Sequence, residues 1–143
     1  MEIKNKKAYF NYFVENEIES GIVLTGTEIK SIRKGSVNIK DSYIRIKNNE
    51  VFIINMYIAK YENGNIFNHD EYRERKLLLH KREINKIKEK VSQEGYTLVP
   101  VNIYLKKNKA KVMIGVCKGK KTFDKRQVIK EKDIIKSSYQ KIS

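Results

Sequence analysis

The 143-residue sequence contains one cysteine, one proline and two histidines, and it has no long apolar run. The single cysteine, Cys117, cannot form an intramolecular disulfide, and its apolar neighbours favour a buried side chain. No segment approaches the roughly 20 apolar residues that a membrane span requires, and the lysines of residues 1–10 are not followed by the apolar segment of a signal peptide. We therefore expect a cytoplasmic protein that does not bind membranes.

The sequence also has few residues that could carry catalysis or hold a metal. His69, His80 and Cys117 are far apart along the chain, which disfavours a structural zinc site. Adjacent residues such as His69 and Asp70 rarely orient toward one another, and the acidic residues of 15–19 are typical of a solvated strand face. Neither a glycine-rich phosphate loop nor a nucleophile elbow is present. We expect no enzyme activity and no cofactor.

Positive charge, by contrast, is abundant. The chain has 31 Lys and Arg against 17 Asp and Glu, a formal net charge of +14 and a pI near 9.7. Residues 118–143 hold nine of these cations and three acidic residues, which is +6, and the preceding 117 residues hold the remaining +8. Such an excess indicates a polyanionic partner. We expect residues 1–117 to fold as one domain and the basic residues 118–143 to form a tail that orders on binding.

Two helices are predicted from capping signals and apolar spacing. Thr25 and Glu28 form the pattern of a capping box and Gly35 provides a stop, so a helix should span about 26–34. Ile84, Ile87 and Val91 recur at spacings of three and four residues and predict a second, amphipathic helix over 81–91. The basic residues in the last turn of the first helix are candidates for phosphate contacts.

Strands are predicted for most of the rest. Residues 41–59 should form a hairpin around Asn48 and Asn49, and residues 96–116 a second hairpin in which Pro100 indicates an edge or a bulge. The aromatic run at 9–14 and the apolar residues from Gly21 onward predict strand segments interrupted by an acidic bend. Residues 61–75 are polar, which favours a surface loop.

These elements fit a small antiparallel β-barrel with appended helices. Oligonucleotide-binding barrels are the common RNA-binding members of this class, and an SH3-like barrel is the alternative architecture. From the residues alone, a general RNA-binding module such as a ribosome-associated or cold-shock-like barrel, and a basic domain bound to DNA, remain the alternative functions.

Several strings, taken in order, resemble the SmpB or SsrA-binding protein family. The resemblance runs nearly from end to end of the chain and rests on residues 5–8, 12–13, 22–31, 38–43, 68–70, 73–83, 119–121 and 124–126. It implies a mainly β fold: an oligonucleotide-binding-type antiparallel barrel with two or three flanking helices and a basic C-terminal tail that is disordered when free. It also implies that the protein, as a monomer in a one-to-one complex, binds the tRNA-like part of transfer-messenger RNA. The tail would then enter the decoding centre of a stalled ribosome.

The resemblance also suggests which residues contact RNA. Glu19, Leu78 and His80 match positions that the family needs for RNA binding, and for Leu78 a place in the core is a strong alternative. A carboxylate cannot hold phosphate, but it can accept hydrogen bonds from a 2′-hydroxyl or a base amine. The candidates for phosphate contacts are Lys30, Arg33, Lys34, Arg73, Arg75, Lys76, Lys120 and Lys121. The candidates for decoding-centre contacts are Phe123, Asp124, Lys125 and Arg126, with the Phe123 ring placed to stack on a ribosomal base.

Overall fold

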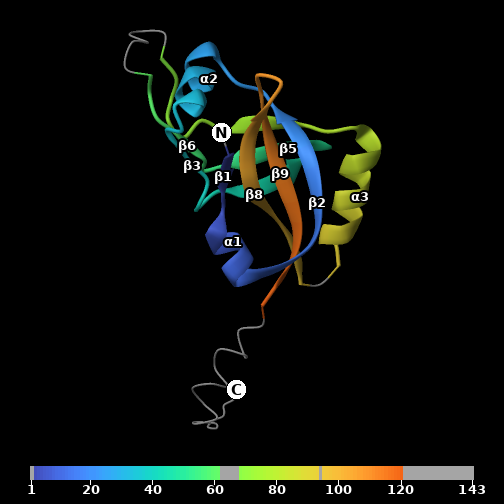
Figure 1. The fold of residues 1–143 in the computed structure, drawn as a ribbon. Helices are drawn as coiled ribbons and strands as arrows, with labels where there is room; N and C mark the ends of the chain where they lie inside the picture. The colour runs from blue at the N-terminus through green and yellow to red at the C-terminus, as the bar shows by residue number, and fades with distance from the viewer. Residues whose placement is uncertain (1, 62–67, 94, 121–143) are drawn as a thin grey trace, which may run out of the picture.

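The computed structural model describes residues 2–61, 68–93 and 95–120, which form a mainly β fold with three helices (Figure 1). The elements are β1 (Glu2–Lys4), α1 (Lys6–Asn11), β2 (Tyr12–Ile22), α2 (Gly26–Arg33), β3 (Val37–Asn38), β4 (Tyr43–Lys47), β5 (Glu50–Ile54), β6 (Tyr57–Ile58), β7 (Arg75–Leu78), α3 (Lys81–Val91), β8 (Tyr96–Lys106) and β9 (Lys109–Gly119). None of the helices in this part of the chain is long and apolar enough to cross a membrane.

Seven strands make one antiparallel sheet in the order β1-β8-β9-β2-β7-β5-β4, and β3 pairs with β6 in a small second sheet. The long strands β2, β8 and β9 lie at the centre of Figure 1 with α3 beside β2, and α1 lies at the end where β2 begins. The predicted mainly β, antiparallel class with a few helices is therefore confirmed.

The two helices expected from capping signals are present. Glu28 N–H donates to Thr25 Oγ1, and Thr25 N–H donates back to Glu28 Oε1 at 2.8 Å, so the predicted capping box closes at the start of α2. Gly35 follows this helix with a φ of +78°, the left-handed conformation that glycine adopts without strain. Helix α3 covers the predicted residues 81–91.

Both predicted hairpins are also present. Asn48 and Asn49 turn β4 into β5 with φ angles of +52° and +63°. In the second hairpin the pairing of β8 with β9 shifts between Pro100 and Asn102, which is the predicted bulge. Because β8 lies between β1 and β9, Pro100 is in an interior strand, where a bulge accommodates the missing N–H.

The N-terminal segment differs from the prediction. Residues 6–11 form α1, although a strand was expected from Tyr9 onward, because the buried side chain of Asn5 accepts a hydrogen bond from Ala8 N–H and caps the helix. Strand β2 then runs unbroken through the acidic residues, with a bulge between Val14 and Asn16. The predicted acidic bend is wrong because Glu15 and Glu17 lie exposed on the strand surface, where charge does not require the strand to end.

The buried side chains form two clusters. The larger one packs residues of α2, α3 and most of the strands, and is centred on side chains such as Ile32, Ile53, Leu77 and Ile114. The smaller one contains Ala8, Val99, Val101 and Cys117 and attaches α1 to the sheet. Cys117 is buried as predicted, and burial, helped by the charge of Glu17, raises the pKa of its thiol to about 11.

Candidate nucleic-acid interface

A row of cross-strand neighbours crosses four strands of the main sheet. Tyr104 of β8 is paired with Lys111 of β9, Lys111 with Gly21 of β2, and Gly21 with Leu78 of β7. Paired residues project from the same face of a sheet, so their side chains form one line. A Cβ added to Gly21 would lie 3.3 Å from Leu78 Cβ, which shows how closely the leucine approaches this strand.

An open groove lies along this row. Glu19, Leu78 and His80, which are separated by up to 61 residues in the sequence, all contribute to its wall. The remaining lining residues are Glu17, Ile18, Gly21, Leu79, Glu83 and Lys111. The structure thus gathers into one place the three residues that the sequence resemblance assigned to RNA binding.

Glu19 is a half-buried carboxylate held by two neighbours. The hydroxyl of Tyr104 donates a hydrogen bond to Glu19 Oε2, and Lys106 Nζ lies 3.5 Å from Glu19 Oε1. The hydrogen bond from Tyr104 is the main reason that the pKa of Glu19 lies below its ordinary value. Burial and the same carboxylate raise the pKa of Tyr104. Glu19 is therefore a charged, oriented acceptor, suited to a 2′-hydroxyl or a base amine.

Leu78 and His80 present their side chains to solvent at the edge of the groove. Leu78 is 51% exposed, because the alternation of β7 places Leu77 in the core and Leu78 on the opposite face. The expectation of a core position for Leu78 is therefore wrong. His80 is the exposed residue before α3, and its backbone N–H donates to Glu83 Oε1 at 2.9 Å.

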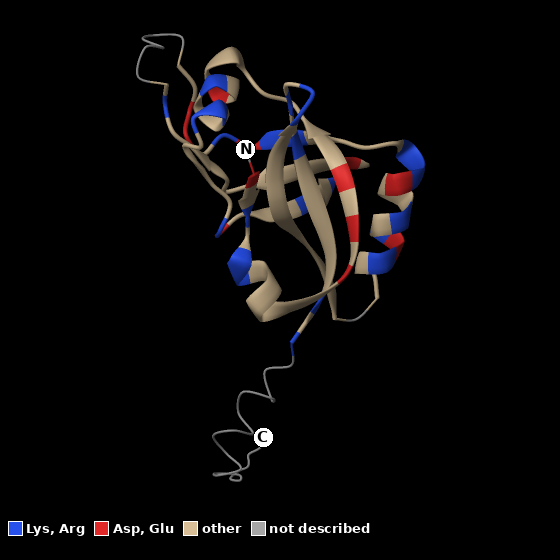
Figure 2. Ribbon diagram, in the orientation of Figure 1, with Lys and Arg blue, Asp and Glu red and all other residues tan. Residues whose placement is uncertain are grey.

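Helix α2 presents a basic surface at its C-terminal end. Lys30, Arg33 and Lys34, which are predicted to contact phosphate, are exposed there. Figure 2 shows basic positions, in blue, on this helix. The Lys30 and Lys34 ammonium groups lie 5.4 and 5.1 Å from the centroid of the Tyr61 ring. The aromatic face orients these two cations through cation–π contacts, and exposed cations of this kind are suited to phosphate.

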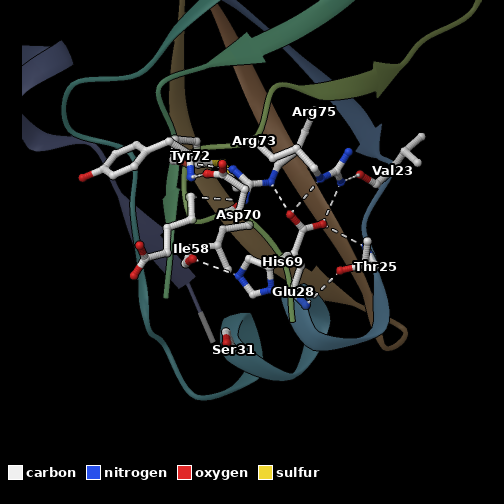
Figure 3. A network of polar contacts seen from close by, with 12 residues as sticks. Val23, Thr25, Glu28, Ser31, Ile58, His69, Asp70, Tyr72, Arg73 and Arg75 are labelled. Atoms are coloured by element: carbon white, nitrogen blue, oxygen red, sulfur yellow. Dashed lines mark hydrogen bonds and ion pairs between the residues drawn. The ribbon is translucent and has the colours of Figure 1, made fainter. Parts of the chain in front are cut away.

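Arg75, by contrast, was predicted to contact phosphate but is fully buried. It donates to Glu28 Oε2 from Nε at 2.7 Å and to the Met56 carbonyl from Nη1 at 2.6 Å (Figure 3). The prediction for Arg75 is wrong, because the charge of Glu28 and the carbonyl groups around it satisfy the guanidinium inside the protein.

Arg73 shares Glu28 with Arg75 but remains partly accessible. Its Nη2 donates to Glu28 Oε1 at 2.7 Å and to the Val23 carbonyl at 3.3 Å, and the side chain is 37% exposed. Burial alone would raise the pKa of Glu28, but hydrogen bonds from Arg73, Thr25 N–H and Arg75 lower it to about 2. The network therefore fixes the segment leading into β7 against α2.

The remaining predicted cations differ in their surroundings. Lys76 is exposed and pairs with Glu50 at 2.8 Å. Lys120 is half-buried, with its ammonium over the rings of Phe10 and Phe13. Lys121 and the four decoding-centre candidates, Phe123, Asp124, Lys125 and Arg126, lie outside the described residues.

The chemistry-bearing residues considered for catalysis do not assemble in the described structure. The ring of His69 is buried between Thr27 Oγ1, 2.8 Å from Nδ1, and the Ile58 carbonyl, 2.9 Å from Nε2, instead of contacting Asp70 through a ring nitrogen. Within residues 2–61, 68–93 and 95–120, no three His, Cys, Asp or Glu side chains gather in a way that could hold a metal ion.

Sequence reasoning missed two residues at these sites. Tyr104 alternates with the apolar residues of β8, and this alternation predicts that its side chain lies on the face opposite to theirs. Its partner Glu19 could not be predicted, because it lies 85 residues away in the sequence. Glu28 was recognised as a helix cap and not as the partner of two arginines. Pairings between distant segments depend on sheet register, which a single sequence does not specify.

Known proteins match the chain over almost its whole length. The family model described as SmpB protein matches residues 2–143. The SsrA-binding protein of Desulfitobacterium hafniense (strain DSM 10664 / DCB-2) is 59% identical over 129 residues, which cover 90% of this chain and 83% of the relative. That of Staphylococcus aureus (strain JH1) is 57% identical over 131 residues, covering 92% and 85%.

Among solved structures, a chain described as "tmRNA-SmpB: a journey to the center of the bacterial ribosome" aligns with a TM-score of 0.73 and 42% sequence identity, covering 93% of this chain and 94% of that chain. Groove, fold and sequence agree, and the chain belongs to the SmpB protein family.

Proposed function

We propose that this protein binds the tRNA-like part of transfer-messenger RNA, the SsrA RNA, and delivers it to stalled ribosomes for trans-translation rescue. The observation that carries the proposal is the convergence of Glu19, Leu78 and His80 on one groove. Relatives named SsrA-binding protein and the neighbour described as tmRNA-SmpB in the ribosome support it. The protein acts as a binding partner in the cytoplasm, where bacterial ribosomes work, and not as an enzyme.

In this proposal the groove reads the shape of the folded RNA. Glu19 accepts hydrogen bonds from sugar hydroxyls or base amines, and the exposed Leu78 packs against an unstacked base. Phosphates on either side are neutralised by the exposed cations Lys30, Arg33, Lys34 and Lys76, with Arg73 contributing its accessible edge.

Two further parts of the proposal concern architecture. We infer that the sheet belongs to an oligonucleotide-binding-type barrel, and that the chain divides near residue 117 into a folded body and a basic tail. The end of strand β9 at Gly119 supports a boundary close to this position. In the rescue complex the tail residues Phe123, Asp124, Lys125 and Arg126 contact the decoding centre, and one protein binds one RNA.

The proposal is tested by comparing affinities for three RNAs of equal length: a tRNA-like elbow, a duplex and an unpaired strand. We expect the elbow to bind at least tenfold more tightly at the same salt concentration. Equal affinity for all three would contradict the proposal and favour a general RNA-binding barrel.

The tail is tested separately by removing the residues that follow Lys120. The shortened protein should bind the isolated tRNA-like RNA as the full chain does, yet fail to support tagging on stalled ribosomes. A truncated protein that tags normally would remove the tail from the mechanism, and one that loses its fold would show that the tail belongs to the body.

A further inference from the structure

An exposed aromatic cluster lies where α1 leads into β2. Phe10 is 74% exposed, Phe13 is 56% exposed and Tyr9 is 43% exposed, and all three come from α1 and the first residues of β2. Phenylalanines on a strand or helix are ordinarily buried, so adjacent exposed rings mark a surface that contacts a partner.

A lysine joins two of these rings. Lys120 Nζ lies 5.9 Å from the centroid of the Phe10 ring and 5.2 Å from that of Phe13, within the range of cation–π contacts. The backbone N–H of Lys120 donates to the Asn11 carbonyl at 3.2 Å, which holds the end of β9 against α1. The position of the Lys120 ammonium group therefore depends on this backbone hydrogen bond as well as on its contacts with the rings.

Exposed ring faces beside a cation match the two parts of a nucleotide. A base stacks on an aromatic ring, and the phosphate of its backbone pairs with the ammonium group. The carboxylate of Glu17, which accepts a hydrogen bond from Tyr9 Oη at 2.8 Å, would repel phosphate on the β2 side. The phosphate must therefore lie toward Lys120 and the lysine-rich start of α1.

We propose that Phe10, Phe13 and Lys120 form a stacking platform for an unpaired base of small-subunit ribosomal RNA. This inference rests on the proposed function, because the tail that enters the decoding centre leaves the body at Lys120. Phe123 is the third residue after Lys120, which limits their separation to about 10 Å even in an extended chain. The platform therefore lies within reach of the RNA that Phe123 is proposed to contact.

The platform is tested by a photoreactive amino acid placed in the full-length protein. p-Benzoylphenylalanine replaces Phe10 in one variant and the exposed Tyr43 of β4, which lies outside the cluster, in the control. Complexes with the tRNA-like RNA and stalled ribosomes are irradiated and the crosslinked partner is identified. We expect small-subunit RNA to be labelled from position 10 and not from position 43. Labelling of a ribosomal protein, labelling of residues 121–143 of the same chain, or no labelling would each overturn the inference.

Substitution provides the second test. Phe10→Ala should leave affinity for the isolated tRNA-like RNA unchanged and reduce tagging on stalled ribosomes about tenfold, whereas Phe10→Tyr, which keeps a ring, and Tyr43→Ala should tag normally. Normal tagging by Phe10→Ala would refute the platform and leave the proposed function intact. Failure of the unaltered protein to prefer the tRNA-like RNA would refute the proposed function instead, so the two failures are distinguishable.

Discussion

At the scale of single residues, Tyr104 decides how Glu19 is presented in the groove. Its hydroxyl donates from β8 to the Glu19 carboxylate on β2, across the intervening strand β9, and Lys106 Nζ lies near the other carboxylate oxygen. A carboxylate that is held in one rotamer loses less conformational entropy when it accepts a hydrogen bond from RNA. Under the proposed function, Tyr104 is thus a positioning residue, and Glu19 is the group that would contact the RNA.

Tyr104→Phe is expected to reduce affinity for the tRNA-like RNA about three- to tenfold, because the hydroxyl is lost while the ring remains. This corresponds to roughly 0.7–1.4 kcal/mol of binding free energy. Equilibrium binding at fixed salt measures the change, and thermal unfolding verifies the fold. The control is Tyr96→Phe, which removes a similar bond to the exposed Glu15 at the other end of β8 and should bind normally. Equal losses in both variants would contradict a specific role for Tyr104.

Glu28 is the residue whose removal should damage the fold most. Glu28→Gln would leave the buried Arg75 guanidinium without its counter-charge, which costs about 3–5 kcal/mol of unfolding free energy. Urea unfolding measures the loss. Glu50→Gln breaks the exposed pair with Lys76 and should cost less than about 1 kcal/mol. Similar losses for both variants would mean that burial of the Arg75 pair is unimportant.

The same carboxylate predicts a pH dependence. The folded protein lowers the pKa of Glu28 from 4.5 to about 2, so the unfolded chain binds the proton more readily. The stabilisation is then complete above about pH 5 and is lost as the pH falls toward 2. We expect the acid limb of a stability–pH curve to flatten in Glu28→Gln. An unchanged limb would assign acid unfolding to other groups.

At the scale of secondary-structure elements, one side chain adds hydrogen bonds to the apolar contacts that attach α1 to the sheet. Asn5 is buried; its Nδ2 donates to the carbonyls of Pro100 at 2.9 Å and Ile39 at 3.3 Å, while its Oδ1 caps α1. It therefore links the N-terminus, the bulge of β8 and the segment that precedes β4. The aromatic cluster of α1 depends on this link for its position.

Asn5→Ala should lower the free energy of unfolding by about 1–3 kcal/mol, because two buried carbonyls and one helix N–H lose a partner. Chemical denaturation measures the effect. Asn16→Ala removes an exposed side chain that accepts only from Glu17 N–H, and it should change stability by no more than about 0.5 kcal/mol. An Asn5 variant as stable as the Asn16 variant would show that α1 is held by its apolar contacts alone.

The elements that the sequence predicts correctly are those whose signals are local. The Thr25 and Glu28 box, the paired asparagines at 48 and 49, and the alternation of β8 and β9 each specify their own structure within a few residues. Helix α1 was missed because its aromatic residues favour strands, and because the side chain that caps it, Asn5, is held by carbonyls 34 and 95 residues away. The burial of Arg75 was missed for the same reason, since Glu28 lies 47 residues distant.

At the scale of the whole molecule, charge is distributed between body and tail. Residues 121–143 contain seven Lys and Arg and three Asp and Glu, which is +4 of the total +14 and leaves +10 on residues 1–120. Residues 1–120 alone therefore carry enough positive charge to attract folded RNA, and under the proposed function the groove should bind it without the tail.

Affinity for the tRNA-like RNA should consequently fall steeply with salt, with a logarithmic slope near −4 if about five phosphates are neutralised. The protein lacking residues 121–143 should show the same slope within one unit, because these phosphates contact the body. Titrations between low and moderate salt measure both slopes. A slope that is halved by the truncation would place much of the phosphate contact on the tail.

Strand β9 connects the two ends of the molecule. Lys111 in the groove and Gly119 beside α1 belong to this one strand, which is hydrogen-bonded to β8 on one side and β2 on the other. Eight residues of strand span roughly 26 Å. Because a strand that is hydrogen-bonded on both sides cannot bend like a hinge, it keeps a fixed distance and direction between these two residues. An RNA seated in the groove thereby sets how far away, and in which direction, the chain leaves the body.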